Sequence, residues 1–192
     1  MDSRDRLQQR LDLSDAELKK LVLQTPPVLQ YSYKANIEPK LALLQRRLDL
    51  SEVELKKKIV LQAPTVLGLN YEANLEPSLA LLQRRLDLSE VELKKIVLGH
   101  PSVLKCSYEG NLEPSLAALQ GRLDVSEAEL KKIVLGLPPV LCLSFKKNLE
   151  PKLALLQRRL DLSEAELKKI VMGCSTVLVL RYEANIEPKL AL

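Results

Sequence analysis

Basic side chains recur at fixed positions along this chain, and phosphate binding is the chemistry that they suit. The segment LALLQRRL, or its variant LAALQGRL, occurs in four successive copies of a repeat, and its last arginine is present in all four. A second arginine precedes it in three of them. A lysine lies one or two helical turns earlier in three copies. These residues are Arg47, Arg85, Arg122 and Arg159, then Arg46, Arg84 and Arg158, then Lys40, Lys152 and Lys189. If the copies stack, their side chains form a basic ladder that neutralises successive phosphates without reading bases.

The same cations also have a structural interpretation. The arginines lie at the C-terminal ends of expected helices whose first turns are acidic, which suits the helix dipole. Lysines such as Lys19 and Lys20 follow the acidic residues Asp15 and Glu17 at the i,i+3 and i,i+4 spacings that neutralise a solvated face. The net charge of +4, from 29 basic and 25 acidic residues, does not decide between the two interpretations.

An aromatic residue occupies one position in every copy: Tyr33, Tyr71, Tyr108, Phe145 and Tyr182. Stacking on nucleic-acid bases is one interpretation. Packing beside a helix start is favoured over it, because Phe145 substitutes for tyrosine and the hydroxyl therefore looks dispensable.

No set of residues suggests catalysis. His100 is the only histidine, and there is no glycine-rich phosphate loop. Cys106, Cys142 and Cys174 fall at different positions of the repeat without close spacing, which indicates neither a disulfide framework nor a zinc site. We therefore expect no enzyme, no cofactor, no metal and no small-molecule substrate. Because no apolar run approaches ~18 residues, we also expect no membrane span.

The elements that carry these residues follow from an internal repeat. The phrase Asn-x-Glu-Pro occurs five times, at intervals of 38, 37, 37 and 37 residues, starting at Asn36. Each unit opens a first helix with Ser-x-x-Glu, a capping box, as at Ser14 and Glu17. We expect Gly99, Gly136 and Gly173 to end this helix as left-handed caps, with a proline shortly after.

The second helix of each unit is expected to begin at the asparagine of Asn-x-Glu-Pro and to end near Leu48, Leu86, Leu123 or Leu160. About eleven residues between the two helices suit a 3₁₀ turn. The composition is 46% hydrophobic with only 3% aromatic residues, which favours an all-α fold. Such short helices need stacking for stability, so we predict a right- or left-handed α-solenoid of helix–helix–3₁₀ repeats of about 37 residues.

Apolar side chains indicate the packed faces. Ile37, Leu41, Leu44 and Leu48 make one stripe on the second helix. The first helix carries Leu18, Leu21 and Val22 on one face and Ala16 and Leu23 on a second, which predicts that it packs between two neighbours. These residues are read directly from the repeat.

The repeat resembles that of the mitochondrial transcription termination factor (mTERF) family, especially its plant and algal members. The resemblance rests on Pro-x-Val-Leu (Pro101 to Leu104, for example), Asn-Leu-Glu-Pro-x-Leu and Leu-x-Leu-Ser-x-x-Glu-Leu-Lys-Lys-Ile-Val, and it covers essentially the whole chain. It implies a curved solenoid whose basic surface binds double-stranded DNA, or RNA, in mitochondria or chloroplasts, with a role in organellar transcription termination or gene expression.

We therefore expect a non-catalytic nucleic-acid-binding repeat protein, with a protein-binding helical scaffold or a consensus-like repeat protein without a nucleic-acid ligand as the alternative. The expected organisation is one array of about five repeats over residues 1–192, cut within a repeat at both ends. The opening MDSRDRLQQR already resembles the repeat and carries two aspartates, so we interpret it as neither a signal nor a transit peptide.

One copy departs from the pattern. Glu54 to Val60 reads ELKKKIV where the other copies have one lysine fewer. Lys58 pushes the following apolar pair on by ~100° of helix. We predict a one-residue π-bulge here, because a lysine in the core would be costly.

Overall fold

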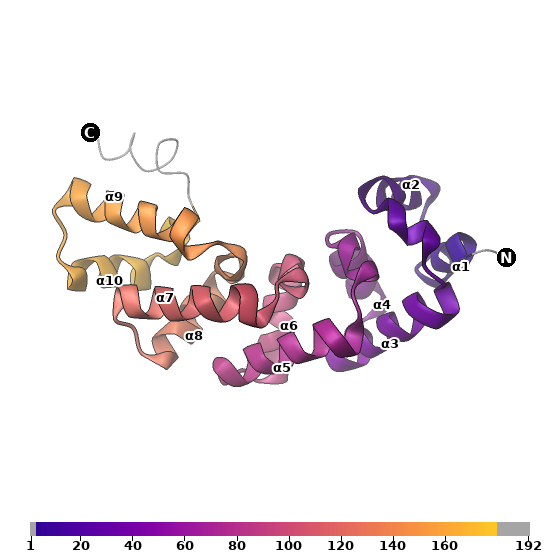
Figure 1. Cartoon of the computed structure of the whole chain (residues 1–192), viewed down its shortest axis with the longest axis horizontal. Coiled ribbons are helices and arrows are strands. Elements are labelled where there is room, and N and C mark those ends of the chain that lie inside the picture. Colours follow the sequence, from indigo (N-terminus) through magenta and orange to yellow (C-terminus); the bar gives the residue numbers. More distant parts are fainter. Residues whose placement is uncertain (1–2, 180–192) are drawn as a thin grey trace. The chain divides into compact units, whose positions relative to one another are not determined.

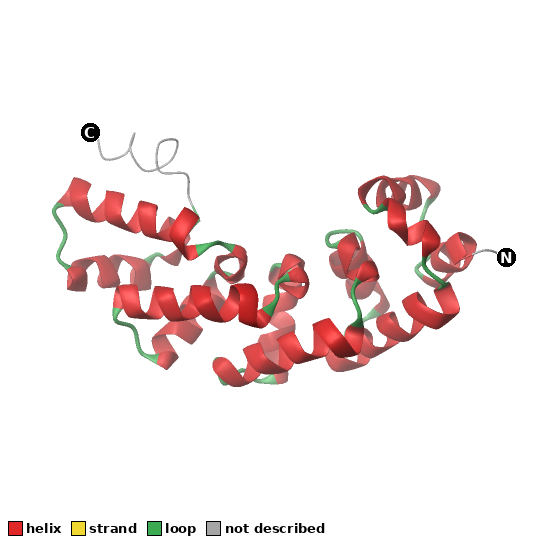
Figure 2. Ribbon diagram, in the orientation of Figure 1, coloured by secondary structure: helices red, strands yellow, loops and turns green. Residues whose placement is uncertain are grey.

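The protein is all helical wherever its structure is described. A computed structural model describes residues 3–179, and helices connected by short loops make up this part, with no strand (Figures 1 and 2). The predicted all-α fold of helix–helix–3₁₀ repeats is confirmed. Within residues 3–179 no helix is both long enough and apolar enough to cross a membrane.

The chain divides into two compact units, and each is described by itself. The first contains Met1–Arg84 and Leu88–Lys105, and the second contains Arg85–Asp87 and Cys106–Leu192. The single array over residues 1–192 stays a prediction.

The first unit alternates short helices of three kinds. Its α-helices are α1 (Ser3–Arg10), α2 (Asp15–Gln24), α3 (Glu38–Arg47), α4 (Glu52–Glu54), α5 (Glu76–Arg85) and α6 (Glu90–Gly99). Its 3₁₀ segments are Pro26–Gln30, Pro64–Gly68 and Pro101–Lys105, and its π-helical segments are Tyr33–Ile37, Leu55–Val60 and Tyr71–Leu75.

The second unit starts with the last residue of α5 and repeats the same order. Its α-helices are α7 (Glu113–Leu123), α8 (Glu127–Gly136), α9 (Glu150–Leu160) and α10 (Glu164–Gly173). Its 3₁₀ segments are Pro138–Cys142 and Ser175–Leu178, and its π-helical segments are Tyr108–Leu112 and Phe145–Leu149.

The predicted capping boxes are confirmed in all five copies. In each, the serine side chain accepts a hydrogen bond from the backbone N–H of the glutamate, and the glutamate side chain accepts from the backbone N–H of the serine. The predicted 3₁₀ turn also follows each first helix. Two unpaired N–H groups are thus satisfied at the start of every first helix, which is the local reason that it begins there.

The second helix begins earlier than predicted. Its cap lies four residues before the asparagine of Asn-x-Glu-Pro. In the first copy the cap is Ser32, whose side chain accepts a hydrogen bond from Ala35 N. The chain then forms one π turn, closed by Ile37 N donating to the carbonyl of Ser32, before α3 begins. Placing the helix start at Asn36 was therefore wrong, because a serine or asparagine four residues upstream provides the cap.

The left-handed residues are aspartates rather than glycines. Gly99, Gly136 and Gly173 are the last residues of α6, α8 and α10, and no glycine among the described residues has a positive φ, so this prediction was wrong. The positive φ values, between 47° and 50°, belong to the aspartate that ends each second helix: Asp12, Asp49, Asp87, Asp124 and Asp161. Aspartate tolerates this conformation, and the next residue's N–H closes the turn.

Lys58 is accommodated as predicted. The capping box gives only one α turn, α4, and the chain then continues as the π-helical segment Leu55–Val60. Leu61 N donates to the carbonyl of Lys56, five residues back, at 3.0 Å. Lys58 is exposed while Ile59 and Val60 are buried, so the extra residue is absorbed without placing a charge in the core.

The core follows the predicted stripe on the second helix. Ile37, Leu41, Leu44 and Leu48 are all 2% exposed or less. The second apolar face predicted for the first helix is wrong in the first copy, where Leu23 is 71% exposed. The reason is that α2 contacts the next repeat through the 3₁₀ segment Pro64–Gly68, which leaves Leu23 in solvent.

Candidate nucleic-acid interface

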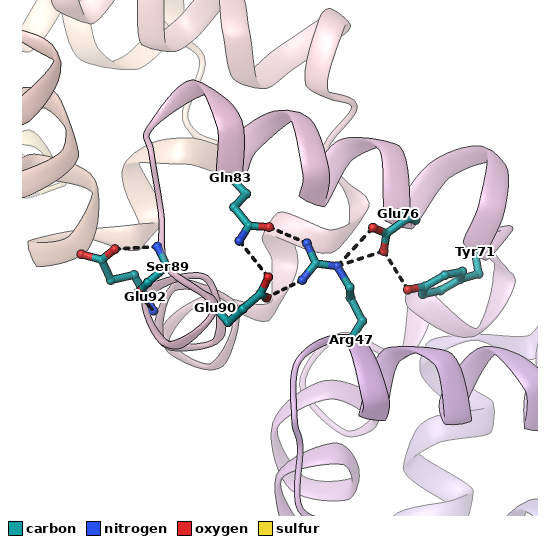
Figure 3. Close-up of polar contacts among 7 residues, drawn as sticks. All are labelled: Arg47, Tyr71, Glu76, Gln83, Ser89, Glu90 and Glu92. Atoms are coloured by element: carbon teal, nitrogen blue, oxygen red, sulfur yellow. Dashed lines mark hydrogen bonds and ion pairs between the residues drawn. The ribbon is translucent and has the colours of Figure 1, made fainter.

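Arg47 lies at the centre of a polar network that joins three successive repeats. It ends α3, and its Nε lies 3.1 Å and 3.2 Å from the two carboxylate oxygens of Glu76 at the start of α5. Its other nitrogens donate to Gln83, in the last turn of α5, and to Glu90, in the first turn of α6. Figure 3 shows the guanidinium surrounded by these three side chains.

The partners of Arg47 are themselves connected. The Tyr71 hydroxyl donates to Glu76 at 2.7 Å, and Gln83 Nε2 donates to Glu90 at 3.0 Å (Figure 3). The Arg47 side chain is 17% exposed. Each of the three guanidinium nitrogens therefore has an acceptor in another repeat. Such charge-assisted hydrogen bonds fix the orientation of the guanidinium.

The same network recurs in the second unit. Arg85 pairs with Glu113, Gln120 and Glu127, and Arg122 pairs with Glu150, Gln157 and Glu164; both side chains are 18% exposed. In the first unit Arg10 makes part of the network, with Gln45 and Glu52. We call Arg10, Arg47, Arg85 and Arg122 the inter-repeat arginines.

Electrostatics agree with this geometry. Burial alone would lower the pKa of Arg47, but hydrogen bonding to Glu90 and the charge of Glu76 outweigh it, so the pKa is raised. The hydrogen bond from Gln83, followed by that from Arg47, lowers the pKa of Glu90. Both partners are therefore charged at neutral pH, and two carboxylates surround one guanidinium.

A lysine makes a second contact between repeats. Lys94 on α6 donates to the backbone carbonyl of Asp49, the left-handed residue between α3 and α4, and forms an ion pair with Glu54 of α4 at 3.1 Å. The equivalent contacts to left-handed aspartates are those of Lys56 with Asp12, Lys131 with Asp87 and Lys168 with Asp124. In four copies, the first lysine of the Lys-Lys pair thus contacts the turn that precedes the first helix of the previous repeat.

Lys40 and Lys152, both predicted to contact phosphate, also bond to the next repeat. Lys40 is 4% exposed, and its ammonium donates to Asn36 Oδ1 at 2.9 Å and to the carbonyl of Leu67 at 2.5 Å. Lys152 donates to the carbonyl of Leu178 at 3.1 Å. Lys189 lies outside the described residues.

Arg46, Arg84 and Arg158 differ from the inter-repeat arginines. Each immediately precedes the last arginine of the segment LALLQRRL on the second helix, and each is exposed. Among residues 3–179, no carboxylate forms an ion pair with any of the three. We call them the outer arginines. Arg46 also lines a groove together with Arg47 and Lys94. Arg159 is exposed and has an interaction partner.

Comparison with protein families agrees with the repeat. A sequence model of the mTERF family matches residues 7–89 and again residues 81–192, which together span nearly the whole chain. The chain belongs to the mTERF family. A search among curated proteins gave no match.

The aromatic position of this mTERF chain serves packing and the arginine network together. Tyr33 is buried, and the hydroxyls of Tyr71 and Tyr108 each donate to the glutamate bound by an inter-repeat arginine, both at 2.7 Å. Where Phe145 replaces tyrosine, Oε2 of Glu150 is buried without a hydrogen bond, although Arg122 Nε lies 3.2 Å away. The hydroxyl thus has a hydrogen-bond partner in two copies, and its dispensability stays a prediction. Tyr182 lies outside the described residues.

Sequence reasoning found the recurring cations of the mTERF repeat but not their partners. The carboxylates and amides that bind Arg122 lie 28, 35 and 42 residues further along the chain. A signal existed, because each copy repeats the glutamate of Asn-x-Glu-Pro, the glutamine and the first-turn glutamate at constant offsets. Only the repeat packing shows that these offsets bring them to one point.

Proposed function

We propose that this mTERF chain is a non-catalytic nucleic-acid-binding repeat protein that acts in organellar gene expression. In this proposal it binds the phosphate backbone of double-stranded DNA, or of RNA, in a mitochondrion or chloroplast. Membership of the mTERF family supports the general class. Transcription termination is the finer role that the family's name suggests.

The observation that carries the proposal is the division of labour between adjacent arginines. An inter-repeat arginine such as Arg47 is surrounded by carboxylates, whereas its neighbour Arg46 is exposed. A cation with two carboxylate partners has little left to offer a phosphate, while an exposed one can release counterions from nucleic acid. We therefore assign phosphate contact first to the outer arginines Arg46, Arg84 and Arg158.

Contact by the inter-repeat arginines stays a prediction. It would require Arg47, Arg85 or Arg122 to leave its glutamates, and so would weaken the contact between repeats. Contacts of the outer arginines to phosphate fix position on a duplex and carry no base information, so we expect affinity with little sequence preference from them.

Titration of labelled duplex DNA and of duplex RNA at several salt concentrations tests the function. We expect log affinity to fall linearly with log salt, and the three outer arginines alone to contribute a slope of about −2.7 for DNA. Failure to bind either nucleic acid at low salt would contradict the proposal.

A protein-binding scaffold is the second candidate, and exposed valines favour it. Val53 and Val91 occupy the same position of α4 and α6 and are 60% and 77% exposed. A partner held by these side chains would bind with little salt dependence and would be lost in a Val53→Glu, Val91→Glu variant. Nucleic-acid binding would not be lost in that variant.

A further inference from the structure

Two cysteines that lie 36 residues apart in the chain meet between successive repeats of the second unit. The Sγ atoms of Cys106 and Cys142 are 3.3 Å apart. Cys106 immediately precedes Ser107, the cap of the π-helical segment Tyr108–Leu112, and Cys142 ends the 3₁₀ segment Pro138–Cys142. The sequence indicated neither a disulfide framework nor a zinc site, and it gave no sign of this contact because the two cysteines occupy different positions of the repeat.

The repeat geometry itself creates this contact. In the first unit the equivalent residues are Tyr31 and Gly68, and a Cβ added to Gly68 would lie 2.8 Å from the Tyr31 hydroxyl. In both units, therefore, the residue that immediately precedes the helix cap in one repeat lies against the last residue of the 3₁₀ segment in the next repeat. In the second unit, the residues at these two positions are Cys106 and Cys142, so a thiol lies on each side of the contact.

We propose that Cys106 and Cys142 form a dithiol oxidation site that closes as a disulfide between two repeats. Hydrogen peroxide, a two-electron oxidant, supplies the chemistry. One thiol loses its proton, and the resulting thiolate attacks a peroxide oxygen, which breaks the O–O bond and leaves a sulfenic acid. The hydroxide that is expelled takes up the proton and becomes water. The second thiol attacks that sulfur, an S–S bond forms, and a second water leaves. The two thiols lose two protons and two electrons, and one peroxide becomes two waters.

The local structure suits this reaction. Both cysteines are half-buried, so a small oxidant reaches them while larger molecules are hindered. A disulfide has its sulfurs about 2.05 Å apart, so they must approach by about 1.2 Å from their present separation. The proposal requires that rotation of the two side chains supply this movement.

The bond would link two segments that belong to successive repeats. Closing a loop of this length restricts the unfolded chain and so stabilises the folded unit. We expect the melting temperature of the oxidised protein to rise by about 4 to 16 °C over that of the reduced protein.

The experiment treats the whole chain with hydrogen peroxide under native conditions and maps the cross-links by mass spectrometry after proteolysis. We expect a loss of about 2 Da, two hydrogens, and one cross-linked pair, Cys106 with Cys142. Reduction with a dithiol should restore the original mass and melting temperature. In denaturant, the same treatment should give a mixture of pairings.

Variants separate this site from general thiol reactivity. Cys174→Ser is the matched control, because Cys174 is exposed and its thiol is hydrogen-bonded to Thr176. This variant should leave the cross-link intact. Cys106→Ser and Cys142→Ser should each abolish both the cross-link and the melting shift. Native oxidation that yields pairs with Cys174, chain-to-chain dimers, or no cross-link would overturn the proposal.

Discussion

Glu150 shows what a single hydroxyl contributes to the repeat. Its counterparts Glu76 and Glu113 each accept a hydrogen bond from a tyrosine, but Phe145 leaves Oε2 of Glu150 buried without one. A buried acceptor without a partner costs free energy that an added donor recovers.

Replacing Phe145 with tyrosine should therefore stabilise the second unit. We expect the free energy of unfolding to rise by about 1 kcal/mol, because the new hydroxyl can donate to Glu150. Urea denaturation measures the change. Tyr108→Phe, which removes the same bond from Glu113, is the matched control and should lower the value by a similar amount. Equal stability of all three proteins would disprove the role given to the hydroxyl.

Lys40 predicts a pH dependence at the residue scale. Burial lowers its pKa from the usual 10.5 to about 8. Between these values the unfolded chain binds more protons than the folded one, so the contribution of Lys40 to stability rises with pH. The unfolding free energy of the wild type minus that of Lys40→Met should therefore increase from pH 8 to pH 10.5. Lys20→Met, at an exposed position, is the control, and a flat difference for Lys40→Met would refute the prediction.

At the scale of elements, local signals in the sequence were the most informative. The capping boxes and the π-helical segment at Lys58 were predicted, because each depends on residues within one or two turns. The start of the second helix was missed because a serine four residues upstream competes with Asn36 as its cap. The glycine caps were wrong because the first helices end without a left-handed residue. The left-handed residues are aspartates that follow the second helices, a position where glycine is the usual residue.

Deletion of Lys58 tests the register argument. The deletion restores ELKKIV, so a regular α-helix can replace the π-helical segment and keep Ile59 and Val60 buried. We expect a folded protein of equal or higher melting temperature. Deleting Lys95 from a regular copy is the control, and it should cost more than about 2 kcal/mol because Ile96 and Val97 leave their buried positions. Similar losses from both deletions would contradict the interpretation.

Across the whole molecule, the recurring arginines fall into two groups, the inter-repeat arginines and the outer arginines. Recurrence in the sequence predicted which side chains line up, and the contacts between repeats decide which of them have carboxylate partners. That second step depends on partners 28 to 43 residues away, which is why the sequence could not separate Arg47 from Arg46. The inter-repeat arginines join repeats within each unit, and we propose the outer arginines as the contacts to phosphate.

The most direct test compares two triple variants for DNA affinity across salt and for thermal stability. Replacing Arg46, Arg84 and Arg158 with glutamine should reduce the log–log salt slope by about 2.7 and leave the melting temperature unchanged. Replacing Arg47, Arg85 and Arg122 with glutamine should lower the melting temperature, because six glutamates lose their partners, and change the slope little in the protein that remains folded. The reverse pattern, with the slope lost in the second variant and kept in the first, would contradict the account.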